Sequence, residues 1–264
     1  MKKLIRIIII LFALSIMSFS AYKLWEVQAE YAEGENIYEG YINNFVETVK
    51  VDTAKVDTGK SGDTVKVEHA AQAAEVEKKI SVDFDSLIKE NQDVVAWIYS
   101  ENTPINYPVV QSHDNDYYLR RLLDHSYNIA GSIFMDYRNS PDFSDFNTII
   151  YGHNLKTDTM FGSLKEYSSQ EYYEKHSEIY LSTPQGDYVI ELISAFRTDI
   201  DDDIYILPQN EKELEDLYHR VVEGSNFHAD SSFEEGDRLI TLSTCSDYGD
   251  EDVRYILIGK LLSI

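Results

Sequence analysis

The sequence has very little cysteine and few basic residues. Cys245 is the only cysteine in 264 residues, so no disulfide can form within the chain. There are 23 lysines and arginines against 47 aspartates and glutamates, which gives a formal net charge of -24. A chain this acidic has no basic stripe to neutralise phosphates, and this excludes a typical nucleic-acid-binding protein. No cysteine–histidine spacing resembles a structural zinc site.

Hydrophobic residues make up 43% of the chain, enough for one folded core, and one apolar run stands at the N-terminus. As a helix, Leu4–Tyr22 would be about 28 Å long, close to the hydrocarbon thickness of a bilayer. Basic residues precede the run and acidic residues follow it, so we expect a cytoplasmic N-terminus and an extracellular remainder. A cleaved signal peptide, with Ser18 and Ser20 at the cleavage site, is the alternative. The length favours an uncleaved signal-anchor over residues 1–22.

Residues 23–79 are expected to link this anchor to the folded domain. Apolar pairs at helical spacing, ending at Phe45 and Val46, predict a helical stalk from Lys23 to about Val46. The segment Val49–Lys79 is rich in valine, lysine, aspartate, threonine and alanine and contains no aromatic residue. Such a composition predicts a flexible acidic tether.

The folded domain is expected over residues 80–264. It opens with a helix for which Asp83 or Asp85 could be the N-cap. Short apolar segments bounded by turn residues predict strands. These segments are Asn106–Gln111, Gly131–Tyr137, Asn147–Asn154, Ile179–Thr183, Asp187–Thr198, Asp237–Cys245 and Val253–Leu262.

One clear helix interrupts the late strands. It runs from Asn210 to Gly224, with Asn210 and Glu213 at capping-box spacing and Gly224 as the stop. Many short strands with few helices predict a mainly β fold, a barrel or a sandwich.

The lone cysteine lies at the end of an alternating strand, Leu239–Cys245, where an acidic loop begins. This strand and the one starting at Val253 are expected to be antiparallel neighbours, which places Cys245 and Arg254 close together at one rim. A guanidinium there would favour the thiolate or stabilise an oxyanion. A small core cysteine beside a surface arginine explains the same pattern.

A cysteine nucleophile needs a proton carrier, and the chain has seven histidines. His153 differs from the others because it ends a buried run and stands between Gly152 and Asn154. The remaining six lie in the tether, in polar loops or on helix surfaces. Spacing alone slightly favours a turn histidine bonded to the backbone, so the proton carrier stays open at this point.

Several motifs together resemble the sortase family of cysteine transpeptidases. They are "TLSTC", the arginine nine residues after its cysteine, and "NTIIYGHN". Class B in particular is matched by "DVVAWIY", "YPVVQSHDNDYYL", "GSIFMDYRN", "YGHNLKTDTMFGSLKEY" and "YILIGKL". The resemblance covers about Phe84 to Leu262. It implies a sortase-type closed β-barrel with an N-terminal helix and one helix inserted between late strands.

The resemblance also implies catalytic roles. Cys245 would be the nucleophile, His153 the general acid/base, and Arg254 the stabiliser of the oxyanion or the substrate carbonyl. Arginine suits this role because it stays charged and offers a planar fork of donors.

Three further residues are weaker candidates. Ser243 and Thr244 could line the substrate groove or be ordinary strand residues. Asp247 could orient the histidine or the arginine, although a loop carboxylate in so acidic a chain is more often simply solvated. The acidic run Asp199–Tyr205 matches no calcium loop, and a solvated loop is the simpler interpretation. The implied chemistry needs no metal and no cofactor.

The implied substrate is the sorting peptide of a secreted surface protein, with a motif such as Asn-Pro-x-Thr-Asn or Pro-x-Thr-Gly. Cleavage after the threonine would give a thioester, and an amine of peptidoglycan or a pilin lysine would accept the acyl group. Two alternatives remain. One is a cell-wall cysteine peptidase with water as the acceptor, and the other is a non-catalytic binding module at the cell surface.

Overall fold

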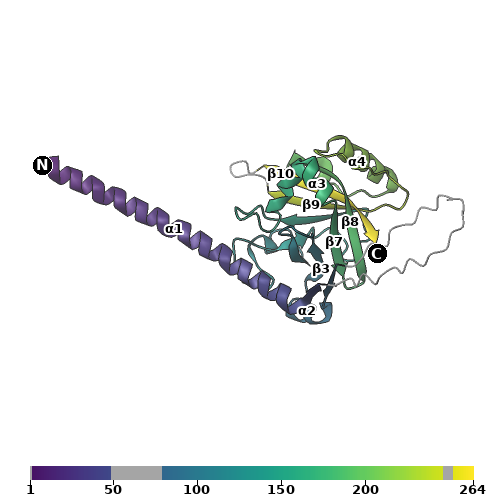
Figure 1. Cartoon of the computed structure of the whole chain (residues 1–264), viewed down its shortest axis with the longest axis horizontal. Coiled ribbons are helices and arrows are strands. Elements are labelled where there is room, and N and C mark those ends of the chain that lie inside the picture. Colours follow the sequence, from purple (N-terminus) through teal and green to yellow (C-terminus); the bar gives the residue numbers. More distant parts are fainter. Residues whose placement is uncertain (1, 49–78, 246–251) are drawn as a thin grey trace, which may run out of the picture.

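The computed structural model describes residues 2–48, 79–245 and 252–264, with Cys245 described by its backbone alone. Figure 1 shows a β-barrel from which one long helix projects. Apart from Lys79, the predicted tether lies outside the described residues.

The barrel is closed and has eight strands, in the order β10-β8-β7-β3-β4-β5-β6-β9. The pairs β4–β5 and β6–β9 are parallel, and the other pairs are antiparallel. The strands are β3 Val94–Tyr99, β4 Asn106–Gln111, β5 Ile133–Met135, β6 Asn147–Gly152, β7 Glu178–Thr183, β8 Gly186–Asp199, β9 Leu239–Cys245 and β10 Val253–Ser263. The predicted mainly β fold is confirmed. Only β3 among the barrel strands had not been assigned from the sequence.

Successive side chains of a strand point to opposite faces of the barrel wall, and apolar side chains are buried on both faces. In β9, Ile240 and Leu242 belong to the large cluster inside the barrel. Leu239 points the other way and joins a second cluster beneath α4, Glu211–Glu223. The cap of α4 is as predicted, because the Glu213 backbone N–H donates to Asn210 Oδ1 at 3.0 Å. Burial on both faces of β9 fixes its register, since a one-residue slip would exchange the faces.

The other helices within residues 79–245 are short. α2, Phe84–Glu90, is capped by Asp83, whose Oδ1 accepts from Ser86 N at 3.1 Å. Of the two candidate caps, Asp83 is therefore the one used. The sequence had not predicted α3, Gln170–Lys175, or the 3-10 helices η1 Tyr117–Arg120, η2 Gly162–Ser168 and η3 Asp203–Tyr205.

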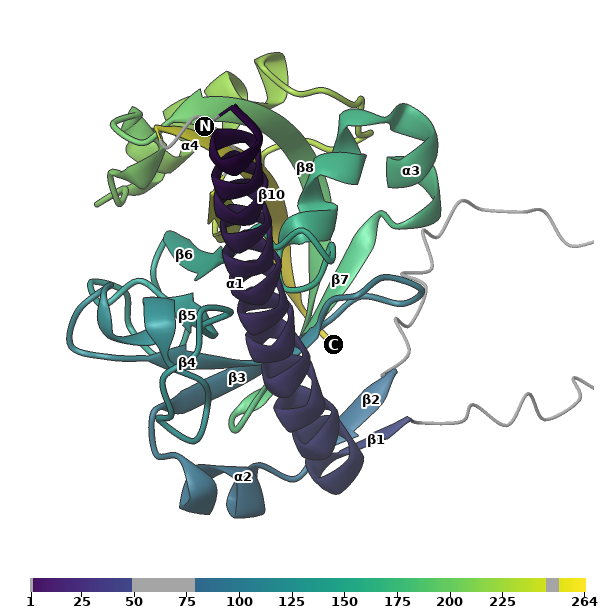
Figure 2. The ribbon, with the colours of Figure 1, turned by 90° about the vertical axis from the view of Figure 1, so that its left-hand side faces the viewer.

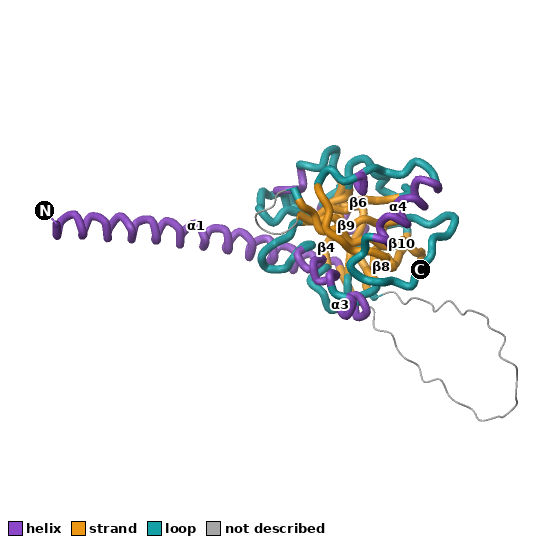
Figure 3. Tube along the Cα trace, turned by 90° about the horizontal axis from the view of Figure 1, so that it is seen from above, coloured by secondary structure: helices purple, strands orange, loops and turns teal. Residues whose placement is uncertain are grey.

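The longest element is α1, Lys2–Phe45, a single helix of 44 residues and about 66 Å. The expected anchor and stalk helices are thus continuous. Its N-terminal part is long and apolar enough to cross a membrane, and it makes no buried contact with the barrel. Figure 3 shows this part extending away from the barrel while the C-terminal part lies against it, and Figure 2 shows the C-terminal end of α1 beside α2.

The docked part of α1 is fitted closely to the barrel. Tyr38 is only 3% exposed and belongs to the barrel core. A Cβ on Gly34 would lie 3.2 Å from Asn128 Oδ1 and 3.4 Å from Ala130 Cβ, so a larger residue would need these side chains to shift by a few tenths of an ångström. After α1 the chain forms β1, Val46–Thr48, which pairs with β2, Ile80–Val82.

Candidate active site

Three adjacent strands bring the predicted catalytic positions to one end of the barrel. β6 and β9 are parallel, and their pairing ends with Gly152 opposite Thr244. His153 directly follows the end of β6, and Cys245 is the last residue of β9. On the other side of β9, Arg254 of the antiparallel β10 pairs directly with Cys245. The predicted proximity of Cys245 and Arg254 is thus confirmed for the backbone, and all three roles stay predictions.

The imidazole of His153 is anchored through one nitrogen. Its Nε2 lies 2.7 Å from the carbonyl oxygen of Leu119, in η1. A carbonyl oxygen can only accept, so Nε2 carries the hydrogen and Nδ1 is the nitrogen that can exchange a proton. The sequence had favoured a backbone-bonded turn histidine, and that bond is present. It engages Nε2 and is compatible with proton transfer at Nδ1.

The surroundings of His153 disfavour its charged form. Burial lowers the pKa of the imidazole, and the nearby Arg120 acts in the same direction. The hydrogen bond to Leu119 opposes this shift without reversing it. The side chain is therefore a neutral imidazole at neutral pH.

Packing fixes the backbone at His153. A Cβ on Gly152 would lie 2.5 Å from Ile133 Cδ1 and 2.7 Å from the Phe161 ring, so no larger residue fits there without displacement. The Phe161 N–H donates to the carbonyl oxygen of His153 at 3.0 Å. The glycine before the histidine is thus a packing requirement.

A groove of about 340 Å³ opens beside these strand ends. Its lining is mostly apolar or aromatic, and Arg254 supplies a charged group. The lining residues are Asn115, Leu119, Phe134, Tyr151, Gly152, Ile200, Tyr205, Ser243, Thr244 and Arg254. Ser243 and Thr244 line the groove as predicted, and their part in holding a substrate stays a prediction. Asp247 lies outside the described residues.

Two stacked tyrosines form one wall of the groove. The rings of Tyr151 and Tyr205 are 6.3 Å apart with an interplanar angle of 20°. Tyr205 Oη lies 2.9 Å from Ser243 Oγ, and Tyr151 Oη donates to Asp136 Oδ2 at 2.9 Å. Asp136 is fully buried and paired with Arg138, so Tyr151 is hydrogen-bonded to a buried carboxylate whose charge is balanced. A wall of this kind suits an extended peptide with apolar side chains.

Sequence reasoning assigned no role to several of these groups. Leu119 and Tyr151 lie in motifs that resemble the family. Leu119 acts through its backbone carbonyl, which every residue type has, so the sequence gives no signal for this role. Tyr205 ends the acidic run Asp199–Tyr205, which had been interpreted as a solvated loop. Asp202 in this run instead accepts from Ile204 N at 2.8 Å and shapes η3.

No group of three or more histidine, cysteine, aspartate or glutamate side chains is placed to hold a metal ion within residues 2–48, 79–245 and 252–264.

A second cavity, of about 270 Å³, lies between α1 and the barrel, and residues of the groove do not line it.

Comparison with known proteins gives a consistent result. The Sortase domain family matches residues 98–262. Sortase B of Staphylococcus aureus is 35% identical over 184 residues, which is 69% of this chain and 75% of that protein.

Solved structures agree with the sequence match. The structure of sortase B from B. anthracis in complex with AAEK1 has a TM-score of 0.72 and 30% identity, covering 90% of this chain and 100% of that chain. The Staphylococcus aureus sortase B-substrate complex has a TM-score of 0.65 and 34% identity, covering 69% and 85%. This chain therefore belongs to the sortase family of cysteine transpeptidases, and its relatives are sortases B.

Proposed function

We propose that this chain is a membrane-anchored sortase that cleaves a sorting motif after threonine and transfers the acyl group to an amine of the cell wall or of a pilin. The observation that carries this proposal is the strand register that sets Cys245 between His153 and Arg254 beside an apolar groove. Sortase B has been seen in a substrate complex and in a complex with triglycine. Both fit a peptide donor and an amine acceptor.

In the first half-reaction the thiol proton of Cys245 passes to Nδ1 of His153, and the thiolate attacks the threonine carbonyl carbon. Arg254 donates hydrogen bonds to the oxyanion, a contribution of roughly 2.7–4 kcal/mol for one donor in comparable sites. The imidazolium then protonates the leaving amine as the C–N bond breaks, and a thioester remains. Because burial lowers the pKa of His153, its imidazolium is a stronger acid than usual, which suits this step.

In the second half-reaction an amine attacks the thioester carbon. Nδ1 of His153 accepts the proton that this nitrogen loses, and Arg254 again stabilises the oxyanion. The C–S bond breaks, the amide forms, and the proton returns from the imidazolium to the sulfur. One amide bond is exchanged for another, so no oxidant, metal or water is consumed.

The N-terminal part of α1 is the proposed anchor. Its large hydrophobic side chains from Leu4 to Leu24 are exposed, which suits a helix surrounded by lipid. The basic residues before the run favour a cytoplasmic N-terminus, with residues 80–264 as an extracellular catalytic domain. The first hydrogen bonds from α1 to the barrel are made by Glu30. From Lys23 to Glu30 the helix rises about 10 Å, so the barrel would sit close to the membrane surface.

The test uses the full chain in detergent micelles with a library of peptides carrying Asn-Pro-x-Thr-Asn or Pro-x-Thr-Gly. Triglycine is the acceptor, and products are identified by mass. We expect the wild type to join the fragment ending in threonine to triglycine, and we expect Cys245→Ala to give no product.

Other outcomes contradict the proposal in distinct ways. Cleavage that yields only a free carboxylate, whatever the triglycine concentration, would indicate a cysteine peptidase. No cleavage of any peptide, with wild type and Cys245→Ala binding alike, would indicate a binding module.

A further inference from the structure

Tyr38 is the most deeply buried large side chain of α1, and its buried hydroxyl makes hydrogen-bond contacts with the barrel. Tyr38 Oη donates to the carbonyl oxygen of Gly131 at 2.9 Å and lies 2.8 Å from Ser132 Oγ. Burial raises the pKa of this phenol, so it keeps its proton for donation. The ring also meets Tyr107 edge-to-face, with centroids 5.4 Å apart. A helix that served only as a tether would not need such a contact.

The two residues that the Tyr38 hydroxyl contacts, Gly131 and Ser132, pack against the segment whose Leu119 carbonyl accepts the hydrogen bond from the His153 imidazole. Gly131 has φ +59°, and a Cβ built on it would lie 2.6 Å from the carbonyl oxygen of Leu119. The backbone of Gly131 is therefore packed against the carbonyl that accepts the hydrogen bond from the imidazole. Ser132 N donates to Tyr118 O at 3.0 Å, and Ser132 Oγ donates to Arg121 O at 2.8 Å. Together these contacts hold η1 on both sides of Leu119.

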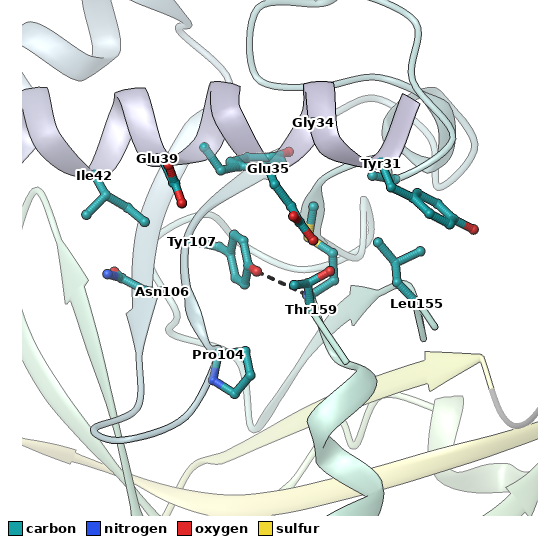
Figure 4. Close-up of a pocket in the computed structure, with 13 residues that line it drawn as sticks. Tyr31, Gly34, Glu35, Glu39, Ile42, Pro104, Asn106, Tyr107, Leu155 and Thr159 are labelled. Atoms are coloured by element: carbon teal, nitrogen blue, oxygen red, sulfur yellow. Dashed lines mark hydrogen bonds between the residues drawn. The ribbon is translucent and has the colours of Figure 1, made fainter. Parts of the chain in front are cut away.

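The ring of Tyr38 is connected to the backbone of His153 through a second series of contacts. Its partner Tyr107 accepts a hydrogen bond at Oη from Met160 N at 3.1 Å, drawn as a dashed line in Figure 4. Met160 has φ +55°, a strained conformation for a residue with a side chain, so this bond stabilises an otherwise unfavourable turn. The next residue, Phe161, donates through N–H to the carbonyl oxygen of His153 at 3.0 Å.

We propose that Tyr38 is a positioning residue for His153, acting through Gly131 and Leu119 on the imidazole and through Tyr107 and Met160 on the backbone. The inference rests on the proposed function of His153 as the proton carrier. It assigns to α1 a part in the reaction besides anchoring.

The chemical effect is on the tautomer. The carbonyl of Leu119 stabilises the form with hydrogen on Nε2, which leaves Nδ1 to exchange the proton. When this acceptor is displaced, the opposite tautomer and other ring orientations become populated. The fraction of molecules ready for proton transfer then falls, which lowers kcat. Leu119 is one of several residues that line the groove, so KM should change much less than kcat.

The experiment compares full-length variants in detergent micelles. Tyr38→Phe removes the hydroxyl and keeps the ring contact with Tyr107. The matched control is Tyr41→Phe, one turn further along the same face, where the ring stacks on Phe45 at 5.8 Å. Initial rates are measured with triglycine and the peptide of the library above that the wild type processes fastest. We expect Tyr38→Phe to lower kcat about tenfold with KM within about twofold, since small misplacements of reacting groups cost up to about 100-fold. Tyr41→Phe should match the wild type.

A second readout does not depend on turnover. The ¹⁵N shifts of the His153 ring, assigned by their loss in His153→Ala, report which nitrogen carries hydrogen. The wild type and Tyr41→Phe should show the Nε2–H form, and Tyr38→Phe should show a mixture of both tautomers. If Tyr38→Phe melts too early to be assayed, Ser132→Ala removes the hydroxyl that contacts Tyr38 and bonds to Arg121 O beside η1, and it should reproduce both changes.

Both changes must appear together. A fall in kcat without a tautomer change means that Tyr38 is merely structural and overturns the inference, and so does a tautomer change with an unaltered kcat. The inference is also overturned if Tyr38→Phe has the same kcat and the same His153 tautomer as the wild type. His153→Ala separates this failure from failure of the proposed function, because transfer that persists in that variant contradicts the role of His153 itself.

Discussion

The two strands that flank β9 at the catalytic end are held in different ways. On the β6 side, Gly152 is enclosed by Ile133 and Phe161, both fully buried, and His153 is bonded to the backbone of η1. On the β10 side, Arg254 is half-buried and borders the groove, where Ile200 is 44% exposed. Arg254 donates to the carbonyl oxygen of its neighbour Val253 at 3.0 Å.

This difference separates two kinds of effect. A change on the β6 side disturbs core packing and should alter folding and reaction together. A change on the β10 side meets solvent and the groove, so it should alter the reaction with little effect on folding.

Arg254→Ala should lower kcat by about 100- to 1000-fold, the usual loss when one donor to an oxyanion is removed. The melting temperature should change little, because the side chain is half-buried at the rim of the groove. Arg254→Lys keeps the charge and loses the planar fork, so it should recover only part of the rate. Steady-state transfer to triglycine and thermal unfolding are the measurements. A large fall in melting temperature would contradict the division.

Gly152→Ala should lower the free energy of unfolding by about 1–3 kcal/mol, the usual cost of overpacking a core, and should lower the rate as well. The added methyl would overlap with Ile133 and Phe161. Gly186→Ala is the matched control, because no heavy atom lies within 4 Å of the corresponding Cβ. Denaturant unfolding of both variants gives the comparison. Equal stability of the two would show that the β6 side can relax.

Tyr205→Ala should raise KM about tenfold, since one aromatic contact contributes about 0.5–1.5 kcal/mol beyond its buried area. The ring lines the groove and stacks on Tyr151. kcat should stay within a few-fold, because the role proposed for this ring is to bind the peptide and not to transfer a proton. A peptide titration separates the two constants, and a loss confined to kcat would argue against a peptide-binding role for this wall.

The smallest effect concerns pH. Burial lowers the pKa of His153 in the folded chain, so between the folded and the unfolded values the unfolded chain binds more protons. Stability therefore rises with pH across this window. The contribution of His153 to the folding stability is complete above the ordinary histidine pKa of about 6.5. It is lost as the pH falls toward the pKa of the folded chain. The wild type should lose more stability than His153→Gln between neutral and mildly acidic pH. Parallel curves for both proteins would contradict the burial of this imidazole.

Local patterns in the sequence predicted much of the barrel. Alternation located β9, and a capping pair located α4 and its first turn, because both signals lie within a few residues. The proximity of Cys245 and Arg254 followed from two neighbouring strands with one short connection. The buried strand β3 was missed because its run Val94–Tyr99 is apolar on both faces and lacks alternation.

The role of His153 could not be derived from spacing. Its proximity to Cys245 depends on the parallel pairing of β6 with β9, whose residues are more than 90 positions apart in the chain. Only the resemblance to sortases suggested it. The contribution of Tyr38 was hidden for a similar reason, because it acts on backbone carbonyls that no residue type reveals.

The central claim is that Cys245 carries the acyl group during transfer. Intact-protein mass spectrometry of the full chain, mixed with the sorting-peptide library and no amine acceptor, tests it most directly. We expect an added mass equal to the peptide fragment ending in threonine, located on the proteolytic fragment that contains Cys245 and missing from Cys245→Ala. Cleaved peptide with unmodified Cys245 at every time point, or cleavage that persists in Cys245→Ala, would contradict it.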